Sequence, residues 1–103
     1  MDITIIMSRF VEIDKLKKNT KILMDTKNTV FEVVVTGPKS SGVRVRGGTF
    51  FVRPTKAKIT GRIEKGKPVI FTYPDTSGWR EFITSEIISI RISAYDDSWH
   101  YDI

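Results

Sequence analysis

The chain contains no cysteine. Disulfide bonds, thiolate metal sites and cysteine nucleophiles are therefore excluded, and a chain held together by packing alone fits a reducing compartment such as the cytoplasm. Long hydrophobic runs are also missing, since no stretch approaches the roughly 20 apolar residues of a membrane span. Residues 1–10 lack the basic start and the small-residue cleavage site of a signal peptide. We expect a soluble cytoplasmic protein that does not contact membranes.

Histidine is scarce as well, because His100 is the single example. A three-histidine zinc site and a pair of acid–base histidines are thus impossible. A Ser–His–Asp triad would have to use His100, and no G-x-S-x-G motif supports one. The carboxylates that could form a catalytic pair are scattered over turns and strand faces: Asp25, Glu32, Asp75, Glu81 and Glu86. We expect no enzymatic activity and no cofactor.

Short alternating segments dominate the rest of the chain. Its 103 residues suit one domain spanning residues 1–103. From Lys21 onward apolar residues recur at every second position, which is typical of half-buried strands. The expected strands are residues 30–36, 43–46, 49–53, 57–63, 68–73, 79–84 and 86–92, with a further short strand in 3–7. Gly47-Gly48 indicates a hairpin turn. The expected core residues are Phe31, Val33, Val35, Ile59, Phe71, Ile88 and Ile90.

One stretch has helical spacing. Within residues 8–18, Phe10, Ile13 and Leu16 fall at i, i+3 and i+6, and Ser8 is a suitable N-cap. We therefore expect one N-terminal α-helix over about residues 8–18, a β-barrel over about residues 22–92 and a tail at 93–103. The tail is polar and aromatic together, so it could add an edge strand through its aromatic residues or lie over one end of the barrel.

Three segments of the barrel region follow a recurrent pattern. They read LMDTKNTVFEVVV at 23–35, VRVRGGTFF at 43–51 and ITSEIISI at 83–90. Together with a glycine-containing strand between them, they resemble a family of uncharacterised small bacterial proteins, and their layout is similar to SH3-like barrels. The resemblance covers about residues 22–92 and implies a fold, without an active site. The fold class is thus a mainly β, small SH3-like or related barrel of about six or seven short strands with one helix.

Two segments carry partial signals for ligands. Gly37 and Gly42 have the glycine spacing of a phosphate-binding loop, but Val43 and Arg44 stand where that loop needs Lys and Ser or Thr, so a hairpin loop is the better interpretation. The tail gathers groups that could chelate a cation, although tails of this composition are usually solvated. These groups are Asp96, Asp97, His100 and Asp102. We expect no metal site.

Two further features have both a structural and a functional interpretation. The side chains of Asp25, Thr26, Asn28 and Thr29 suit hydrogen bonds to nearby backbone, so we expect them to hold the turn into the strand at Val30 rather than a ligand. Trp79 follows a turn and is either a core residue or an aromatic anchor at the surface, and we favour the core.

The strongest functional signal is basic. Arg44 and Arg46 alternate with valines, so both guanidinium groups leave the same face of one strand. Lys56, Lys58 and Arg62 alternate in the same way on a neighbouring segment. If these segments pair, the sheet carries a basic face with an aromatic residue beside it, which is how small barrels hold single-stranded nucleic acid. The candidate nucleic-acid-binding residues are Arg44, Arg46, Phe50, Lys58 and Arg62. The structural alternative is a solvated face that guards against edge-to-edge aggregation.

The net charge agrees with this signal without requiring it. The chain carries 17 Lys and Arg against 12 Asp and Glu, a formal charge of +5, which permits binding to polyanions. We therefore expect a non-enzymatic binding module with an unidentified protein partner. The alternatives are a module that binds single-stranded nucleic acid through the basic face, and a structural protein that forms homo-oligomers through its edge strands.

Overall fold

The computed structural model describes residues 5–37 and 42–93 of the chain, and strands make up 60% of the structure. The described residues form ten strands. These are β1 Ile5–Ser8, β2 Phe10–Val11, β3 Lys21–Asp25, β4 Val30–Gly37, β5 Gly42–Gly47, β6 Phe51–Ile59, β7 Ile63–Glu64, β8 Ile70–Asp75, β9 Gly78–Ile83 and β10 Ser89–Ser93. One turn of 3-10 helix, η1 Ile13–Lys15, lies between β2 and β3.

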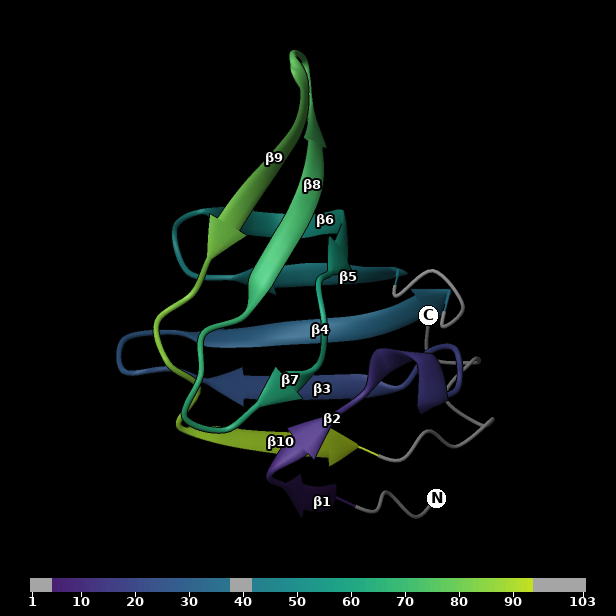
Figure 1. The fold of residues 1–103 in the computed structure, drawn as a ribbon, viewed down its shortest axis with the longest axis vertical. Coiled ribbons are helices and arrows are strands. Elements are labelled where there is room, and N and C mark those ends of the chain that lie inside the picture. Colours follow the sequence, from purple (N-terminus) through teal and green to yellow (C-terminus); the bar gives the residue numbers. More distant parts are fainter. Residues whose placement is uncertain (1–4, 38–41, 94–103) are drawn as a thin grey trace.

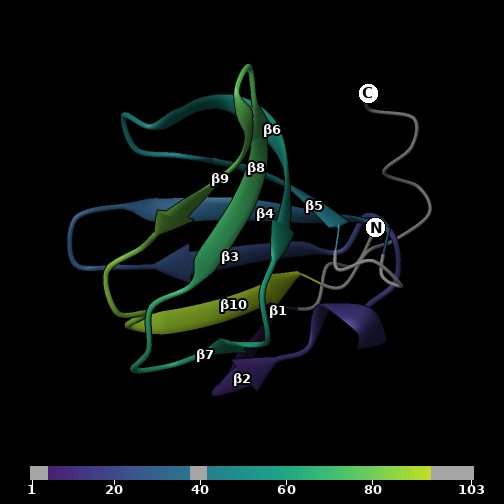
Figure 2. The same ribbon diagram turned by 45° about the horizontal axis from the view of Figure 1, so that its top comes forward.

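The strands form two antiparallel sheets. Eight of them make a large sheet in the order β1-β10-β3-β4-β5-β6-β8-β9, and β2 pairs with β7 in a small one. In Figure 1 the axes of β3, β4, β5 and β10 are nearly aligned, whereas the β8–β9 hairpin crosses them at a steep angle. The small sheet lies in front of β3 and β10 in this view, and Figure 2 shows it from a second angle.

The expected mainly β fold is confirmed, but the strands of the expected small barrel do not close into one. β1 and β9 are the two edges of the large sheet, and no strand pairing among the described residues joins them. The pairing of β8 with β6 is short, because it consists of two residue pairs, Lys58 with Thr72 and Ile59 with Phe71. The hairpin therefore diverges from β6 instead of continuing around to β1, and the sheet curls without closing.

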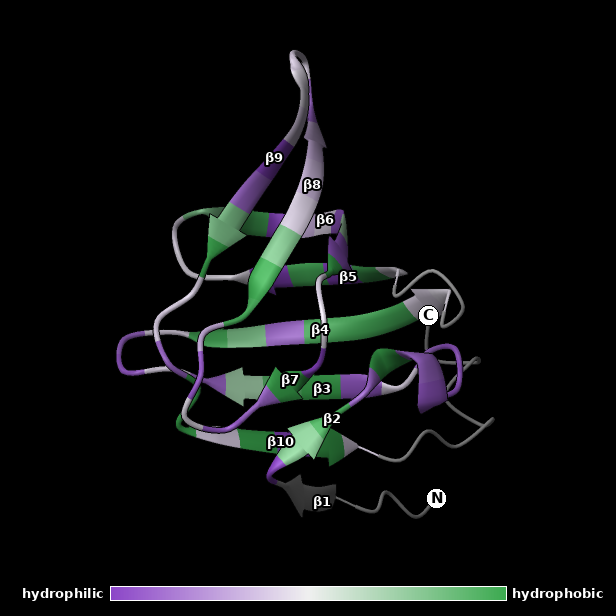
Figure 3. Ribbon diagram, in the orientation of Figure 1, coloured by the Kyte–Doolittle hydropathy of each residue, from purple (hydrophilic) through white to green (hydrophobic). Residues whose placement is uncertain are grey.

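Alternation along the strands builds the core. In β3, β4 and β5, every second side chain is buried and the residues between them are exposed or half-buried. Figure 3 shows this alternation along the ribbon as changes between apolar and polar colours. The inward side chains meet residues of the small sheet and of η1 in one cluster. Its members on the three strands are Ile22, Met24, Phe31, Val33, Val35, Val43 and Val45.

Aromatic rings fill the end of the core beneath the β8–β9 hairpin. The ring of Phe31 lies 6.5 Å from that of Phe51, 6.1 Å from that of Phe71 and 6.1 Å from that of Phe82, between centroids. Most of these pairs meet edge to face, an arrangement that the charge distribution of the rings favours. The hairpin is thus anchored to the sheet by its inward rings more than by strand pairing.

The β5–β6 hairpin forms at Gly47 as expected, but its turn is longer than two residues. β5 ends at Gly47, β6 begins at Phe51, and the register shifts between Val45 and Gly47. A Cβ atom on Gly47 would lie 2.6 Å from the carbonyl oxygen of Val30, which is closer than real Cβ atoms approach. The close approach of β4 at this bulge therefore requires glycine.

The expected α-helix over residues 8–18 is wrong. Phe10 and Val11 form strand β2, and the residues after it make a single 3-10 turn. Val11 and Ile13, two positions apart, are the buried residues here, whereas Phe10 is half exposed. The spacing of Phe10, Ile13 and Leu16 that suggested a helix is divided between a strand and a turn. Tertiary burial of Ile13 and pairing with β7 override the local pattern.

The expected core is confirmed at six of its seven positions, and Ile88 is the exception. Its exposed fraction is 53%, whereas its neighbour Ile87 is buried at 1%. Residues 84–88 are not a strand, and the N–H of Ile87 donates to the carbonyl of Lys67 at 3.1 Å. Strand alternation begins only at Ser89, so extending it back to Ile88 assigns the wrong isoleucine to the core.

This pair gives a direct test of the fold. Replacing Ile87 by Ala should lower the free energy of unfolding by about 2–5 kcal/mol, because it leaves a cavity in the core. Replacing Ile88 by Ala should change it by at most about 0.5 kcal/mol, the usual range for an exposed site. Urea denaturation followed by circular dichroism measures both. Equal losses, or a larger loss at Ile88, would show that the segment before β10 is placed wrongly.

Candidate nucleic-acid interface

The outer face of β5 and β6 brings two cations directly opposite each other. Val43 and Val45 point into the core, so the alternating residues of β5 leave the other side of the sheet. Arg44 pairs in register with Lys56 of β6, and both side chains are exposed. Lys58 lies two residues further along β6, and side chains at this spacing share a face about 6.6 Å apart. These three cations thus lie together on the outer face of β5 and β6.

None of these three cations is compensated by an ion pair with another described residue. Arg46, next along β5, donates to Glu32 of β4 at 3.1 Å, and Lys21 of β3 approaches the same carboxylate at 3.5 Å. Arg44, Lys56 and Lys58 form no ion pair with any residue in 5–37 or 42–93, and the opposed pair of Arg44 and Lys56 brings two of them closest together. Like charges directly opposite each other on a sheet are destabilising. The protein therefore maintains this pair against a local electrostatic cost.

An exposed tryptophan completes the face. The register runs from Lys58 to Thr72 of β8 and to Glu81 of β9, so Trp79, two residues before Glu81, lies on the same outer side. The Nζ of Lys58 is 5.2 Å from the centroid of the Trp79 ring, and the residue is 58% exposed. A cation held over a ring that is open to solvent leaves much of the ring available to a ligand. We call Arg44, Lys56, Lys58 and Trp79 the basic face.

The exposure of Trp79 overturns the expectation that it is a core residue. The turn before it, Asp75 to Gly78, is tight, and β9 starts at Gly78 directly after it. Trp79 therefore falls on the outer side of the hairpin, opposite Pro74, and the aromatic residue that enters the core from β9 is Phe82. Sequence alternation was sufficient to separate these two faces, but it could not say which one the core would use.

Arg62 lies away from the other predicted site residues. Its guanidinium is 3.0 Å from the carboxylate of Glu64 in β7 and 4.4 Å from the ring centroid of Phe10 in β2. Its side chain therefore lies against the small sheet, and its charge is compensated there. The chain bends at Thr60 and Gly61, which breaks the alternation expected to continue from Lys58.

Phe50 also lies apart from the basic face. Its ring stacks on Phe82 with centroids 4.5 Å apart and meets Phe51 and Tyr73 edge to face. These partners are inward residues, so the half-exposed ring of Phe50 covers the aromatic end of the core. The structure thus brings together Arg44, Arg46 and Lys58 of the five predicted site residues, and it adds Lys56 and Trp79.

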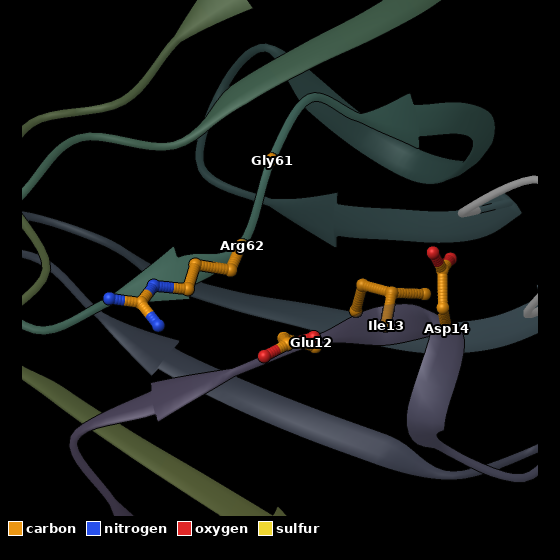
Figure 4. A pocket seen from close by; sticks show the side chains of 5 residues that line it. All are labelled: Glu12, Ile13, Asp14, Gly61 and Arg62. Carbon is orange, nitrogen blue, oxygen red and sulfur yellow. The ribbon is translucent and has the colours of Figure 1, made fainter.

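A hollow of about 440 Å³ lies between η1 and the chain before β7. Figure 4 shows the five residues that line it: Glu12, Ile13, Asp14, Gly61 and Arg62. The side chain of Asp14 points away from that of Glu12, and the guanidinium of Arg62 extends toward β7. Glu12 also has its own partner, Lys15, at 3.5 Å. Substrate binding or acid–base chemistry would require the charged groups to converge on one point. These groups do not converge.

The carboxylates with perturbed pKa values belong to surface ion pairs. Hydrogen bonding from the backbone N–H of Thr76, together with Arg80, holds the pKa of Asp75 below its usual value. Partial burial alone would raise the pKa of Glu64, but the charges of Lys67 and Arg62 lower it overall. Lowered carboxylate pKa values indicate stabilised anions, not general acids poised near neutrality.

Within the cluster expected to hold the turn into β4, Thr26 and Thr29 have that role, whereas Asp25 has a different one. The hydroxyl of Thr26 accepts a hydrogen bond from the N–H of Thr29 at 3.1 Å and donates to its carbonyl at 2.8 Å, which holds the β3–β4 turn. Asp25 instead joins β3 to β10, since its carboxylate accepts from the hydroxyl of Ser89 and lies 3.1 Å from Arg91. Its oxygens are thus committed to the sheet.

Two sequence signals lie outside the described residues. These are the loop core at 38–41 and the tail groups Asp96, Asp97, His100 and Asp102, so neither the phosphate-loop spacing nor the metal cluster is placed. Within residues 5–37 and 42–93, no three metal-ligating side chains come together. The same residues contain no helix that is long and apolar enough to span a membrane.

Comparison with known proteins adds no assignment. No family model, no curated protein and no solved structure matches the chain.

Proposed function

We propose that this protein is a non-enzymatic module that binds single-stranded nucleic acid on its basic face. The observation that carries the proposal is the opposed pair of Arg44 and Lys56, which has no acidic partner among the described residues and lies beside the Lys58–Trp79 contact. The resemblance of residues 22–92 to small bacterial proteins implies a fold of this kind and no competing activity. A cytoplasmic location, as expected from the absence of cysteine, gives such a module access to its ligand.

Phosphate groups would relieve the electrostatic cost of this face. A phosphate near Arg44 and Lys56 interacts favourably with both cations, and its binding releases condensed counterions from the nucleic acid. Arg46 contributes less, because Glu32 already holds its guanidinium. The affinity should therefore come mainly from Arg44, Lys56 and Lys58, and it should fall steeply as salt rises.

The exposed tryptophan favours single strands over duplexes. Stacking on Trp79 requires a base whose ring face is accessible, and in a duplex each base is covered by its neighbours. Stacking of bases on aromatic side chains tolerates any sequence, because every base has a π-face. The carboxylate of Glu81, exposed on the same outer side of β9, limits the face at that edge. A short strand running from β5 over β6 to the hairpin fits this arrangement.

Charge reversal tests the cationic part of the face. The variant Arg44→Glu/Lys56→Glu should abolish the micromolar binding of a labelled oligothymidylate at low salt, measured by fluorescence anisotropy. A variant with only one of the two substitutions should still bind. In it, each lost phosphate interaction should flatten the slope of the logarithm of the binding constant against the logarithm of the salt concentration by about 0.7. The melting temperature should hardly change, because exposed charges contribute little to stability.

The matched control is Lys27→Glu/Lys65→Glu. It changes the net charge by the same amount at two exposed turn positions away from the basic face. It should weaken binding only slightly. Binding that survives reversal at Arg44 and Lys56, or that both double variants abolish equally, would reject the basic face as the site.

Substitution of the tryptophan tests the stacking part. Trp79→Ala should cost about 1–3 kcal/mol of binding free energy, the usual value of one stacked base, which is roughly a 5- to 150-fold loss of affinity. Trp79→Phe should retain most of the affinity, because it keeps an aromatic ring at the same place. Anisotropy titrations of the two variants measure the difference. Equal affinities of both variants and the unchanged protein would show that no base stacks there.

A further inference from the structure

β9, Gly78–Ile83, is an edge strand of the large sheet, and its backbone has one paired and one open side. Among the described residues it pairs with β8 alone, and Trp79 stands opposite Pro74 in that pairing. Proline has no N–H, so this cannot be one of the pairs that exchange hydrogen bonds. Every second residue from Trp79 onward therefore directs its N–H and C=O groups away from β8. These residues are Trp79, Glu81 and Ile83.

Little on β9 prevents another strand from pairing with it. Natural edge strands are usually blocked by lysine, by proline, by a bulge or by being very short. β9 contains neither lysine nor proline, and its six residues pair with β8 in continuous register. The guanidinium group of Arg80 is drawn back to Asp75 and Ser77 at the turn. Trp79 and Ile83 are both more than half exposed, and the hairpin projects beyond the other strands (Figure 1). The edge is thus open to a second chain.

The order of side chains along β9 is complementary to itself. In an antiparallel pairing of two copies centred on Glu81, each Trp79 stands opposite Ile83 of the other copy. These positions carry the open N–H and C=O groups, so each opposed pair exchanges hydrogen bonds. On the other side of the strand Arg80 stands opposite Phe82, so no cation meets a cation.

The balance of opposed pairs favours this register. Aromatic and β-branched residues directly opposite each other stabilise a sheet, whereas like charges destabilise it. The register contains two pairs of Trp79 with Ile83 and one pair of Glu81 with Glu81. The favourable pairs therefore outnumber the unfavourable one. A shift by two residues in either direction would separate both pairs of Trp79 and Ile83.

We propose that two copies of this chain associate through β9, antiparallel and centred on Glu81. The same strand is used on both sides, so the dimer is symmetric and closed. The twofold axis of an antiparallel strand pair is perpendicular to the sheet, and the basic faces of both copies therefore lie on the same side. One strand from each copy makes a small interface, and small interfaces belong to weak complexes. The dimer stands on edge geometry and side-chain order, and it does not depend on nucleic acid binding.

Sedimentation equilibrium of the full chain without nucleic acid tests the dimer. At concentrations up to about 1 mM, the range of weak complexes, monomer and dimer should coexist. Glu81→Pro removes the N–H at the centre of the interface and no bond to β8, as proline is tolerated at such edge positions. It should weaken the dimer about tenfold or more. The matched control Glu81→Gln also removes the carboxylate but keeps the N–H, so it should dimerise about two- to fivefold more tightly.

A mixing experiment tests the register and remains decisive if Glu81→Pro fails to fold. The unchanged chain and the variant Glu81→Lys each face a like charge in their own dimers, whereas the mixed dimer pairs opposite charges at its centre. An equal mixture should therefore contain more dimer than either protein alone. A mixture with Glu86→Lys, which makes the same change of charge at an exposed position outside β9, should show no such excess.

Three results would overturn the dimer. They are a chain that stays monomeric up to about 1 mM, a folded Glu81→Pro variant that dimerises as tightly as Glu81→Gln, and a mixture with Glu81→Lys that shows no excess of dimer. None of them touches the proposed function, which the oligothymidylate titrations decide separately.

Discussion

The register between β4, β5 and β6 is the constraint on which the core and the basic face both depend. On the inward side Val43 stands opposite Ala57, and one residue further on, at the outer side, Arg44 stands opposite Lys56. Because side chains alternate, burial of the first pair fixes the exposure of the second, and a slip of one residue would bury two cations. The packing that stabilises the fold therefore also holds two like charges together, against their mutual repulsion.

Alternation in the sequence predicts most of the strands, because a strand buried on one face has an apolar residue at every second position. It fails where an element is too short to show a period. The spacing of Phe10, Ile13 and Leu16 resembles a helix, yet a two-residue strand and a 3-10 turn divide this segment. It also fails where a strand starts late, as at Ser89, so that Ile87 is buried in place of Ile88. Closure of the sheet depends on long-range pairing, which local patterns do not contain.

The site shows the same division between local and long-range information. Arg44 and Arg46 can be assigned to one face from the sequence, because they are two residues apart in one strand. The sequence does not show that Arg46 is paired and Arg44 is not, because the partner of Arg46 is Glu32, on the neighbouring strand. Alternation extended from Lys58 predicts Arg62 on the same face, but the bend at Gly61 interrupts this alternation. The sequence places Trp79 in the core, whereas it is exposed, because the side of the hairpin that faces the core is decided by tertiary packing.

The central claim is that the uncompensated cations and the adjacent tryptophan form one binding surface. A ¹H–¹⁵N NMR titration with a short oligothymidylate tests it most directly, because it reports every amide at once. We expect the amides of Arg44, Lys56 and Lys58 and the indole N–H of Trp79 to shift together at low salt, and the shifts to fade as salt is added. Shifts centred on Arg62 and the hollow beside η1, or no shifts at low salt, would contradict it.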